Sequence, residues 1–520
     1  MADKLILKVD HNTTYVQGKM ESHIYDQFKK ELGYKPENAY WMIKNNADKA
    51  GDKEEWKKDW DGTISSVCWN AKFCHCHIKK KGLHFPTGLL SKAVDFFRAN
   101  NVQFERIDCR VLTPKTDRYN MSPEFEHRDY QAEVVNKVVG VDGGRGISRG
   151  IIMAATGSGK TSVACSIIAG IGVSPTIFYV PSIDLLKQAK DEIEKFVREN
   201  GSPIEVGIVG GGKKEIKDIT VMTIQTAVRA LGGVWVKYDE EDVNKDDTDI
   251  NDIKEDIKNL IHNCRLQIAD EVQHWAAETC QIISDSSIMC QYRFGMSATP
   301  FRDKGDDILI EACFGKTIAD ISASFLIKRG FLVKPTICFS KINNMRGMGK
   351  TSYANVYKQA IVENEARNAQ IVTMARRFYE SGRKILILVK QIAHGKLLEK
   401  LIPDSIFIHG STGKKKRQKH LDIMRQGLPQ ITIASVIFDE GIDCKPLDTL
   451  ILAGGGKSSS RALQRIGRIL RPYPNKKDAI AVDFMDNCKY MQSHSAKRAS
   501  MYETEEEFNI EIMELKSEKS

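Results

Sequence analysis

Residues 154–161 have the composition of a loop that binds phosphate. They read AATGSGKT, follow the apolar run IIMA and precede the apolar stretch SVACSIIAGI. Glycines let backbone N–H groups approach a phosphate closely, a lysine reaches its outer oxygens, and a hydroxyl can hold Mg²⁺. The first residue, Ala154, stands where the general pattern has glycine. We therefore expect Thr161 to bind Mg²⁺ and five residues to bind the phosphates of a nucleotide: Thr156, Gly157, Ser158, Gly159 and Lys160.

Two adjacent carboxylates, Asp270 and Glu271, end the apolar run LQIAD. Transfer of a phosphoryl group needs neutralised charge and a water held in line for attack. Asp270 is predicted to hold Mg²⁺ through water, and Glu271 to orient and deprotonate the attacking water. An acidic pair is weak evidence by itself, and its value comes from following the phosphate loop within one sheet.

A third group lies far along the chain, in QRIGRILR at 464–471. Its arginines, Arg465, Arg468 and Arg471, are three residues apart, so on a helix they share one face. A basic surface helix would show the same spacing. Because a phosphate loop precedes them, Arg468 and Arg471 are also candidates for arginines that reach ATP from a second domain, with Gln464 beside them.

Two sets of strands must position these residues. Short β-branched runs alternate with helical stretches from about residue 149, and the pattern repeats after Pro335. Continuous apolar strands between helices predict parallel sheets covered on both faces. The first set is expected at 151–154, 176–180, 219–225, 266–270 and 292–298. The second set is expected at 384–390, 405–410, 431–436, 449–454 and 478–484.

The chain of 520 residues is long enough for about three domains. Helical patterns near 23–34 and 89–100 flank an extended segment in the first part of the chain. The predicted fold class is therefore α/β, with two tandem parallel-sheet domains after a small α+β accessory domain. The expected domains are 1–115, 116–330 and 331–520.

The motifs have the order and spacing of those in superfamily-two helicases, which the chain resembles over about residues 125–475. The segments that carry the resemblance are Arg128-Asp129-Tyr130-Gln131, the phosphate loop, Val180-Pro181, Thr223-Ile224-Gln225-Thr226, Asp270-Glu271-Val272-Gln273, Ser297-Ala298-Thr299-Pro300, Ile408-His409-Gly410, Ser435 through Asp443, and 464–471. The resemblance implies two RecA-like domains, ATP and Mg²⁺ as cofactors, hydrolysis of ATP, and a nucleic acid as partner.

The resemblance also implies roles for individual residues. Nucleotide contacts would come from Arg128, Gln131, Gly441 and Asp443. Nucleic-acid contacts would come from Pro181, Gln225, Thr226, Lys390, His409 and Ser435. Coupling between ATP and nucleic acid would pass through Gln273, Ser297 and Thr299. Gln273 departs from the family, which usually has Asp or His there, but an amide can still donate and accept a hydrogen bond.

Within the superfamily the nearest likeness is to phage branch-migration helicases of the UvsW type, with a looser one to the XPB and RecG motors. The features that carry it are Trp60-Asp61-Gly62, Phe85 through Leu90, Gly210 through Lys213, Lys390 with His394-Gly395-Lys396, and Leu452-Ala453-Gly454 leading to Lys457-Ser458. This likeness implies a motor that remodels branched or duplex DNA, including forks, junctions and D- or R-loops, in recombination, repair or replication. An RNA helicase and an ATP-switched motor subunit of a larger complex are the alternatives.

Composition permits a polyanionic partner without demonstrating one. Lysine and arginine number 77 against 68 acidic residues, a net charge of +9. No apolar run approaches the roughly 18 residues that span a bilayer, and the N-terminus lacks the apolar core of a signal peptide. We expect a monomer in the cytoplasm, or in the host cytoplasm if a phage encodes it, with its 12 cysteines reduced.

Three further features allow two interpretations each. The metal-ligand types between Cys68 and His84 favour a β-hairpin over a zinc site, because alternate residues of a strand face opposite sides. The acidic segment 238–259 is expected to be a solvated insertion, with an acidic shield of the nucleic-acid face as the alternative. The run Lys414 through Lys419 is expected to be a solvated helix face, with phosphate contact as the alternative.

Overall fold

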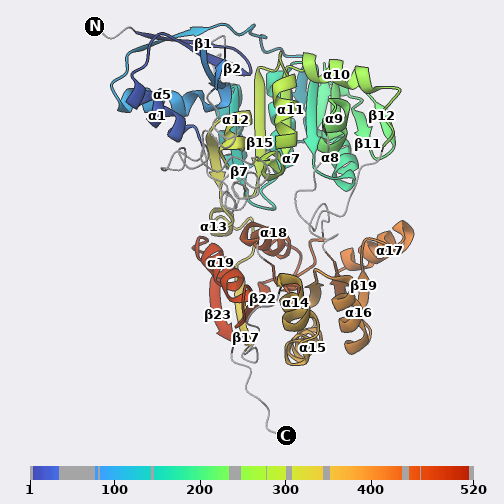
Figure 1. Ribbon diagram of the computed structural model, residues 1–520. Helices are drawn as coiled ribbons and strands as arrows, with labels where there is room; N and C mark the ends of the chain where they lie inside the picture. The colour runs from blue at the N-terminus through green and yellow to red at the C-terminus, as the bar shows by residue number, and fades with distance from the viewer. Residues whose placement is uncertain are drawn as a thin grey trace. The chain divides into compact units, whose positions relative to one another are not determined.

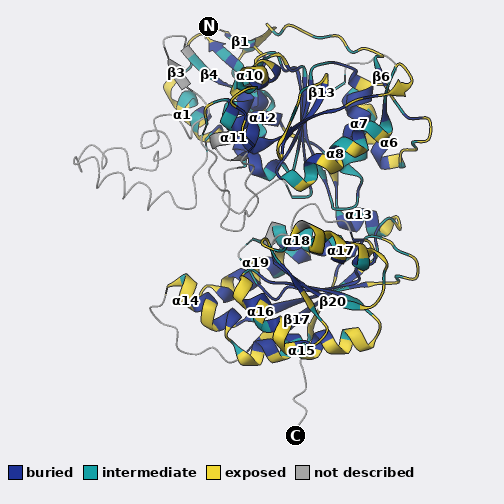
Figure 2. Ribbon diagram, turned by 90° about the vertical axis from the view of Figure 1, so that its right-hand side faces the viewer, coloured by how far each residue is buried: buried dark blue, intermediate teal, exposed yellow. Residues whose placement is uncertain are grey.

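The computed structural model shows two compact units (Figure 1). The first takes most of the chain up to Asp320, and the second takes the chain from Ile321 together with the loop residues Ala154–Ser158. Residues whose structure is described are 4–33, 77–79, 82–141, 146–233, 248–276, 278–299, 307–342, 352–435, 444–456 and 458–513. Burial follows the elements: the central strands of both large sheets are buried, and many exposed residues lie on the outer faces of the helices (Figure 2). None of the described helices is long and apolar enough to cross a membrane.

The first part of the chain forms a sheet with the strand order β3-β4-β2-β1-β5. Its elements are β1 (Leu5–Val9), β2 (Thr13–Gln17), α1 (Ser22–Glu31), β3 (His77–Lys79), β4 (Gly82–Pro86), η1 (Thr87–Leu89), α5 (Leu90–Ala99) and β5 (Phe104–Asp108). Helices α1 and α5 pack on one face, where the rings of Phe28 and Phe97 stack with centroids 4.8 Å apart. His77 lies opposite His84 in antiparallel strands, as the hairpin interpretation expects. The other cysteines and histidines of that cluster lie outside the described residues.

This small sheet is joined to the large sheet of the first unit by polar contacts. Asn12, in the turn after β1, donates a hydrogen bond to the carbonyl of Asp285 at 2.8 Å and accepts one from the guanidinium of Arg293. Arg293 is fully buried. Gly88 lies against helix α12 (Ile308–Phe314). A Cβ atom on Gly88 would come within 2.3 Å of two carbonyl oxygens of that helix. The accessory sheet therefore belongs to the first compact unit.

The large sheet of the first unit has the strand order β12-β11-β13-β8-β14-β15-β7-β16. Its strands are β7 (Arg149–Ala154), β8 (Thr176–Val180), β11 (Gly207–Gly210), β12 (Lys213–Glu215), β13 (Ile219–Thr223), β14 (Leu266–Asp270), β15 (Tyr292–Ser297) and β16 (Thr317–Ile321). The helices around it are α6 (Asp129–Val139), α7 (Lys160–Ile171), α8 (Ile183–Phe196), α9 (Ile224–Ala230), α10 (Lys254–Asn263), η2 (Val272–Ala276) and α11 (Glu278–Ser286). Strands β6 (Tyr119–Met121), β9 (Val197–Glu199) and β10 (Ser202–Pro203) form a separate small sheet that contacts helix α7.

The order of the central strands brings three motifs to one edge. Strands β7, β15 and β14 are parallel neighbours, with β15 in the middle. Parallel strands end at the same edge, which is where α/β sheets bind their ligands. The phosphate loop after β7, Ser297 at the end of β15 and Asp270 at the end of β14 therefore lie side by side.

Helix α10 corrects the interpretation of the acidic segment. Residues 234–247 lie outside the described part, but from Thr248 onward apolar residues of the segment are buried while its acidic residues are exposed. Ile250, Ile257, Leu260 and Ile261 are buried in the main core of the first unit. Within α10, Ile257, Leu260 and Ile261 have the spacing of three and four residues that is typical of an amphipathic helix.

The second unit is built on a sheet with the order β19-β20-β18-β21-β22-β17-β23, in which every neighbouring pair is parallel. Its strands are β17 (Pro335–Ile342), β18 (Lys384–Leu388), β19 (Ile406–Ile408), β20 (Gln430–Ala434), β21 (Thr449–Ile451), β22 (Ala479–Asp486) and β23 (Asn509–Met513). Its helices are α13 (Ala323–Lys328), α14 (Tyr353–Tyr357), η3 (Lys358–Val362), α15 (Glu365–Glu380), α16 (Ile392–Leu401), α17 (Lys414–Arg425), α18 (Ser459–Ile469) and α19 (Met491–Glu503). The predicted fold class, two RecA-like α/β domains in tandem, is confirmed.

The pair His394-Gly395 on α16 has a packing role in the second unit. His394 is fully buried and hydrogen-bonds to Asn368 at 2.9 Å. Burial, with a smaller contribution from the charge of Arg367, lowers its pKa to about 3, so the ring is neutral at pH 7. A Cβ atom on Gly395 would come within 2.2 Å of the ring of Phe407. His394 and Gly395 are part of the likeness to UvsW-type helicases, and their packing in the core accounts for both residue types.

Candidate active site

The phosphate loop joins the buried strand β7 to helix α7 in the manner that its sequence predicts. Gly157 and Gly159 have φ angles of 89° and 81°, which side chains rarely allow. Lys160 is the first residue of α7 and Thr161 the second. The unpaired N–H groups and the dipole of a helix N-terminus favour an anion at this position.

Gln131 lies beside this loop. It is 4% exposed, and a Cβ atom on Gly159 would come within 2.4 Å of its Nε2 atom. Its Oε1 atom accepts a hydrogen bond from the backbone N–H of Arg128 at 3.0 Å, which caps helix α6. Arg128 in turn donates to the hydroxyl of Tyr130 at 2.9 Å. Arg128 and Gln131, both predicted nucleotide contacts, are therefore held together next to the loop.

Lys160 and Glu271 form an ion pair across the edge of the sheet. The Nζ atom lies 3.4 Å from Oε1 of Glu271, and the two side chains are 14% and 17% exposed. Glu271 has a φ angle of 49°, an uncommon conformation for a residue with a side chain. Its backbone N–H donates to Oδ1 of the neighbouring Asp270 at 3.0 Å. The backbone therefore turns sharply here and presents both carboxylates.

The two carboxyl groups differ in their affinity for a proton. Burial, and then the charge of Glu271, raises the pKa of Asp270 to about 7. Burial also raises the pKa of Glu271, but Lys160 and a hydrogen bond from Gln273 outweigh it, so the net shift is downward. Two partly buried carboxyl groups beside a single lysine provide negative charge that a divalent cation can neutralise. The site therefore fits Mg²⁺.

A chain of hydrogen bonds leads from Glu271 to the end of β15. Gln273 donates from Nε2 to Oε2 of Glu271 at 3.0 Å, and its Oε1 atom accepts from the hydroxyl of Ser297 at 2.6 Å. The hydroxyl oxygen of Ser297 accepts from the backbone N–H of Thr299 at 3.0 Å. The amide of Gln273 thus bridges the carboxylate and the next strand, which an aspartate in its place could not do by donation.

The arginine row is only partly as expected. Helix α18 contains Gln464, Arg465 and Arg468, but it ends at Ile469, so Arg471 lies beyond it. Arg471 precedes a proline, and the residue before proline is biased away from helical conformation. The expected shared helix face therefore extends to Arg465 and Arg468 alone.

The predicted nucleic-acid contacts follow the carboxyl ends of strands in both units. Pro181 follows β8, Lys390 follows β18, His409 follows β19 and Ser435 follows β20. Gln225 and Thr226 open helix α9. Their side chains are 7% and 0% exposed, and Thr226 donates its backbone N–H to the hydroxyl of Thr223 at 3.2 Å. Gly441 and Asp443 lie outside the described residues.

Comparison with protein families agrees with this geometry. Residues 124–302 match the family described as "Type III restriction enzyme, res subunit", and residues 368–473 match "Helicase conserved C-terminal domain". Together the two matches cover more than half of the chain.

The chain belongs to the superfamily-two helicases. It is accordingly an ATP-hydrolysing enzyme.

Relatives among characterised proteins are distant but cover much of this helicase. The "DNA 3'-5' translocase XPB2" of Sulfurisphaera tokodaii is 28% identical over 70% of this chain and 82% of its own length. The "ATP-dependent DNA helicase uvsW" of Enterobacteria phage T4 is 25% identical over 42% of this chain and 48% of its own length. The expected likeness to the UvsW and XPB families is therefore confirmed.

A solved structure shows the same fold. The type ISP restriction-modification enzyme LlaBIII, bound to DNA, is 14% identical, with a TM-score of 0.52 over 76% of this chain and 32% of that one. Within the described ranges the helicase has no group of three or more His, Cys, Asp or Glu residues that could hold a metal ion.

Removing the hydroxyl of Ser297 tests the hydrogen-bond chain. Ser297→Ala leaves Oε1 of Gln273 without its 2.6 Å donor, so the amide can rotate away from Glu271. We expect stimulation of ATP hydrolysis by nucleic acid to fall about tenfold, because one lost hydrogen bond in a charged network is worth about 1.5 kcal/mol. Steady-state ATPase assays with and without DNA measure this.

The matched control is Ser287→Ala. Ser287 is also fully buried, and its hydroxyl lies 3.2 Å from Oε1 of another glutamine, Gln267. Ser287→Ala should lower the free energy of unfolding by a similar amount, about 1 kcal/mol, and leave the stimulation of ATP hydrolysis by DNA unchanged. Equal loss of stimulation in both variants would mean that Ser297 acts only through stability.

Proposed function

We propose that this helicase is an ATP-driven DNA translocase that remodels branched DNA, and that it hydrolyses ATP between its two RecA-like domains. The observation that supports this most strongly is the hydrogen-bond chain from Lys160 through Glu271 and Gln273 to Ser297. It connects a phosphate-binding loop, a pair of acidic residues and the end of a neighbouring strand. A binding protein that used ATP only as a ligand would not need Glu271.

Each residue of the first domain has a separate task in this scheme. Lys160 binds the outer phosphates of ATP, and Thr161 with Asp270 would hold Mg²⁺. The cation would neutralise charge on the phosphates. Glu271, whose pKa is lowered, stays ionised and can accept a proton from the attacking water.

The second domain would complete the site. In the proposal Arg468 and Arg471 contact the phosphates only when the two domains close around ATP. A fixed guanidinium then stabilises the charge that develops in the transition state. Nucleic acid held by residues after the strands, such as Lys390 and Ser435, would be displaced in steps as closure and opening alternate.

DNA is preferred over RNA on the basis of the relatives. The archaeal relative is named as a DNA translocase with 3'-5' polarity, and the phage relative as a DNA helicase. We extend the DNA substrate and the polarity to this chain, and we therefore propose that the helicase moves along DNA in the 3'-5' direction. The accessory sheet of the first unit would help to bind forks or junctions.

A panel of substrates tests the proposal. The helicase would be assayed with ATP and Mg²⁺ on a DNA fork, a four-way junction, an R-loop, a linear DNA duplex and an RNA duplex. We expect the fork and the junction to be processed at least about tenfold faster than the RNA duplex. Faster action on the RNA duplex would establish an RNA helicase instead, and ATP hydrolysis without any strand separation would establish the ATP-switched subunit.

A further inference from the structure

An aromatic cluster lies in the second unit, apart from the residues assigned to ATP. The ring of Tyr353 has its centroid 5.8 Å from Tyr490, 5.9 Å from His494 and 6.1 Å from Tyr357. Tyr353 and Tyr357 belong to α14, whereas Tyr490 and His494 lie at the start of α19. The two segments are far apart in the sequence, so no local motif indicated the cluster.

The aromatic cluster extends from a buried ring, Tyr357, to an exposed ring, Tyr490. Tyr357 is 2% exposed, donates its hydroxyl to the carbonyl of Gly454 at 2.6 Å, and packs with Ile361 and Met491. Tyr490 is 38% exposed. A large apolar ring is therefore presented to solvent on a packed support.

Two lysines accompany these rings. The Nζ atom of Lys489 lies 5.0 Å from the centroid of the Tyr490 ring, and that of Lys390 lies 5.9 Å from the Tyr357 ring. Lys390 follows β18 and Lys489 follows β22, so the cluster lies at the carboxyl edge of the sheet. This edge also carries the predicted nucleic-acid contacts.

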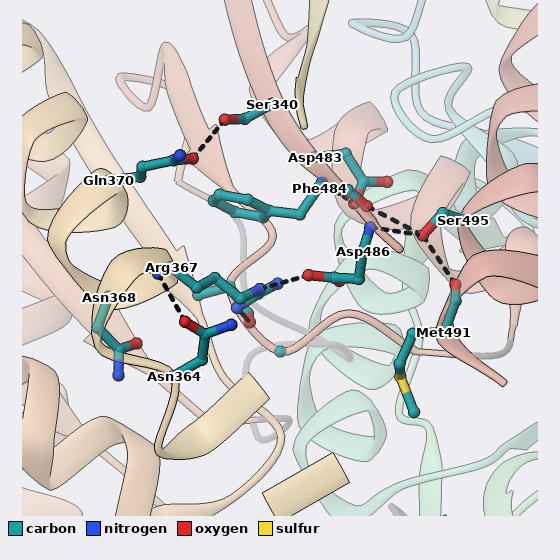
Figure 3. Close-up of polar contacts among 12 residues, drawn as sticks. Ser340, Asn364, Arg367, Asn368, Gln370, Asp483, Phe484, Asp486, Met491 and Ser495 are labelled. Atoms are coloured by element: carbon teal, nitrogen blue, oxygen red, sulfur yellow. Dashed lines mark hydrogen bonds and ion pairs between the residues drawn. The ribbon is translucent and has the colours of Figure 1, made fainter. Parts of the chain in front are cut away.

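The segment that carries Tyr490 is held at both ends (Figure 3). At one end, Asp486 forms a buried ion pair with Arg367, Nε to Oδ1, at 2.9 Å. At the other, the hydroxyl of Ser495 lies 2.9 Å from the carbonyl of Met491 and 3.4 Å from the backbone N–H of Asp486. Tyr490 itself has a φ angle of 66°, which is disfavoured for a tyrosine. Such conformations persist where the surroundings enforce them and are concentrated at functional sites.

We propose that Tyr490, supported by Tyr353, stacks on an unpaired base of single-stranded DNA while Lys489 binds an adjacent phosphate. One nucleotide offers both partners, a π-face for the ring and an anionic oxygen for the ammonium. Aromatic rings that stack on bases, combined with cations that follow the backbone, are how proteins bind single strands without reading sequence. The inference rests on the proposed function, because it assumes that DNA is the nucleic acid.

Binding of a fluorescein-labelled oligo(dT) without ATP tests the platform. Tyr490→Ala should raise the Kd about tenfold, and Tyr490→Trp should restore it, because an indole also stacks. The slope of log Kd against log salt should not change in Tyr490→Ala, whereas Lys489→Ala should reduce its magnitude by about one. Tyr379→Ala, which removes a 44% exposed tyrosine from α15, is the matched control and should bind as the unchanged protein does.

A second measurement needs no variant and stays informative if Tyr490→Ala fails to fold. Moving one abasic position along the oligonucleotide should weaken binding to the unchanged protein about tenfold at one position and less elsewhere. Where Tyr490→Ala folds, it should bind the oligonucleotide that is abasic at this sensitive position with the same Kd as the unchanged protein. Binding of DNA with no effect of Tyr490→Ala or of any abasic position overturns the platform, whereas no binding by the unchanged protein overturns the proposed function.

Discussion

Changing Arg468 to alanine is expected to lower kcat for ATP hydrolysis about 10³-fold, while binding of DNA persists. Arg468 lies on α18 between two buried residues, Gly467 and Ile469, so its backbone is fixed by the core of the second unit. An arginine that reaches the transferred phosphoryl group from a second domain is worth about 10³ or more in rate. Steady-state ATPase assays at saturating ATP and DNA measure kcat, and a fluorescence anisotropy titration measures binding.

Two further variants control this experiment. Arg468→Lys should recover little activity, since a lysine keeps the charge but lacks the planar fork of donors. Arg425→Ala removes an exposed arginine that pairs with Asp422 of its own helix at 3.1 Å, and it should retain full activity. Full ATPase activity in Arg468→Ala would remove Arg468 from the catalytic residues and favour a basic surface helix.

Changing Lys160 to alanine is expected to nearly abolish ATP hydrolysis, with a loss of about 10³-fold. The substitution removes a cation from the phosphates and also from Glu271, whose Oε1 atom lies 3.4 Å from Nζ. Removal of one preorganised donor to developing charge typically costs a factor of about 10² to 10³. Glu271 would lose the main influence that lowers its pKa and become a poorer carrier of negative charge. ATPase assays and nucleotide binding would be measured together.

The matched control for Lys160 is another lysine of the first unit. Lys217 forms an ion pair with Glu205 at 3.0 Å. It precedes β13, so it lies at the amino ends of the strands, whereas the phosphate loop lies at their carboxyl ends. Lys217→Ala should leave ATP hydrolysis unchanged, because an exposed pair contributes little. Lys160→Ala should still bind DNA. Substantial hydrolysis by Lys160→Ala would contradict the assignment of the phosphate loop.

Much of the fold was predictable because its strands are apolar on both faces. The run LQIAD, for example, is buried from Leu266 to Ala269. All ten expected strands are present in the two sheets. Strands without such a run were missed. Strand β5 is mostly exposed, and β17 begins with a proline, a residue that indicates a loop more often than a strand.

Other features needed the structure because their partners lie far apart in the chain. No pattern in the sequence indicates that Asn12 contacts Arg293. The close attachment of the accessory sheet to the large sheet of the first unit could therefore not be predicted when a domain boundary was placed near residue 115. Tyr353 and Tyr490 meet only because β17 and β22 are neighbouring strands that end at one edge.

The sequence by itself determined the chemistry of the phosphate loop and the carboxylate pair. Each is a contiguous motif whose local geometry, a glycine turn or the end of a buried strand, follows from its own residues. Tertiary structure alone decided that Lys160 faces Glu271 and that Gln273 bridges to Ser297. The exit of Arg471 from the helix, in contrast, follows from the proline after it. The two contacts within the sheet edge depend on strand order, which is set by long-range contacts that no local pattern encodes.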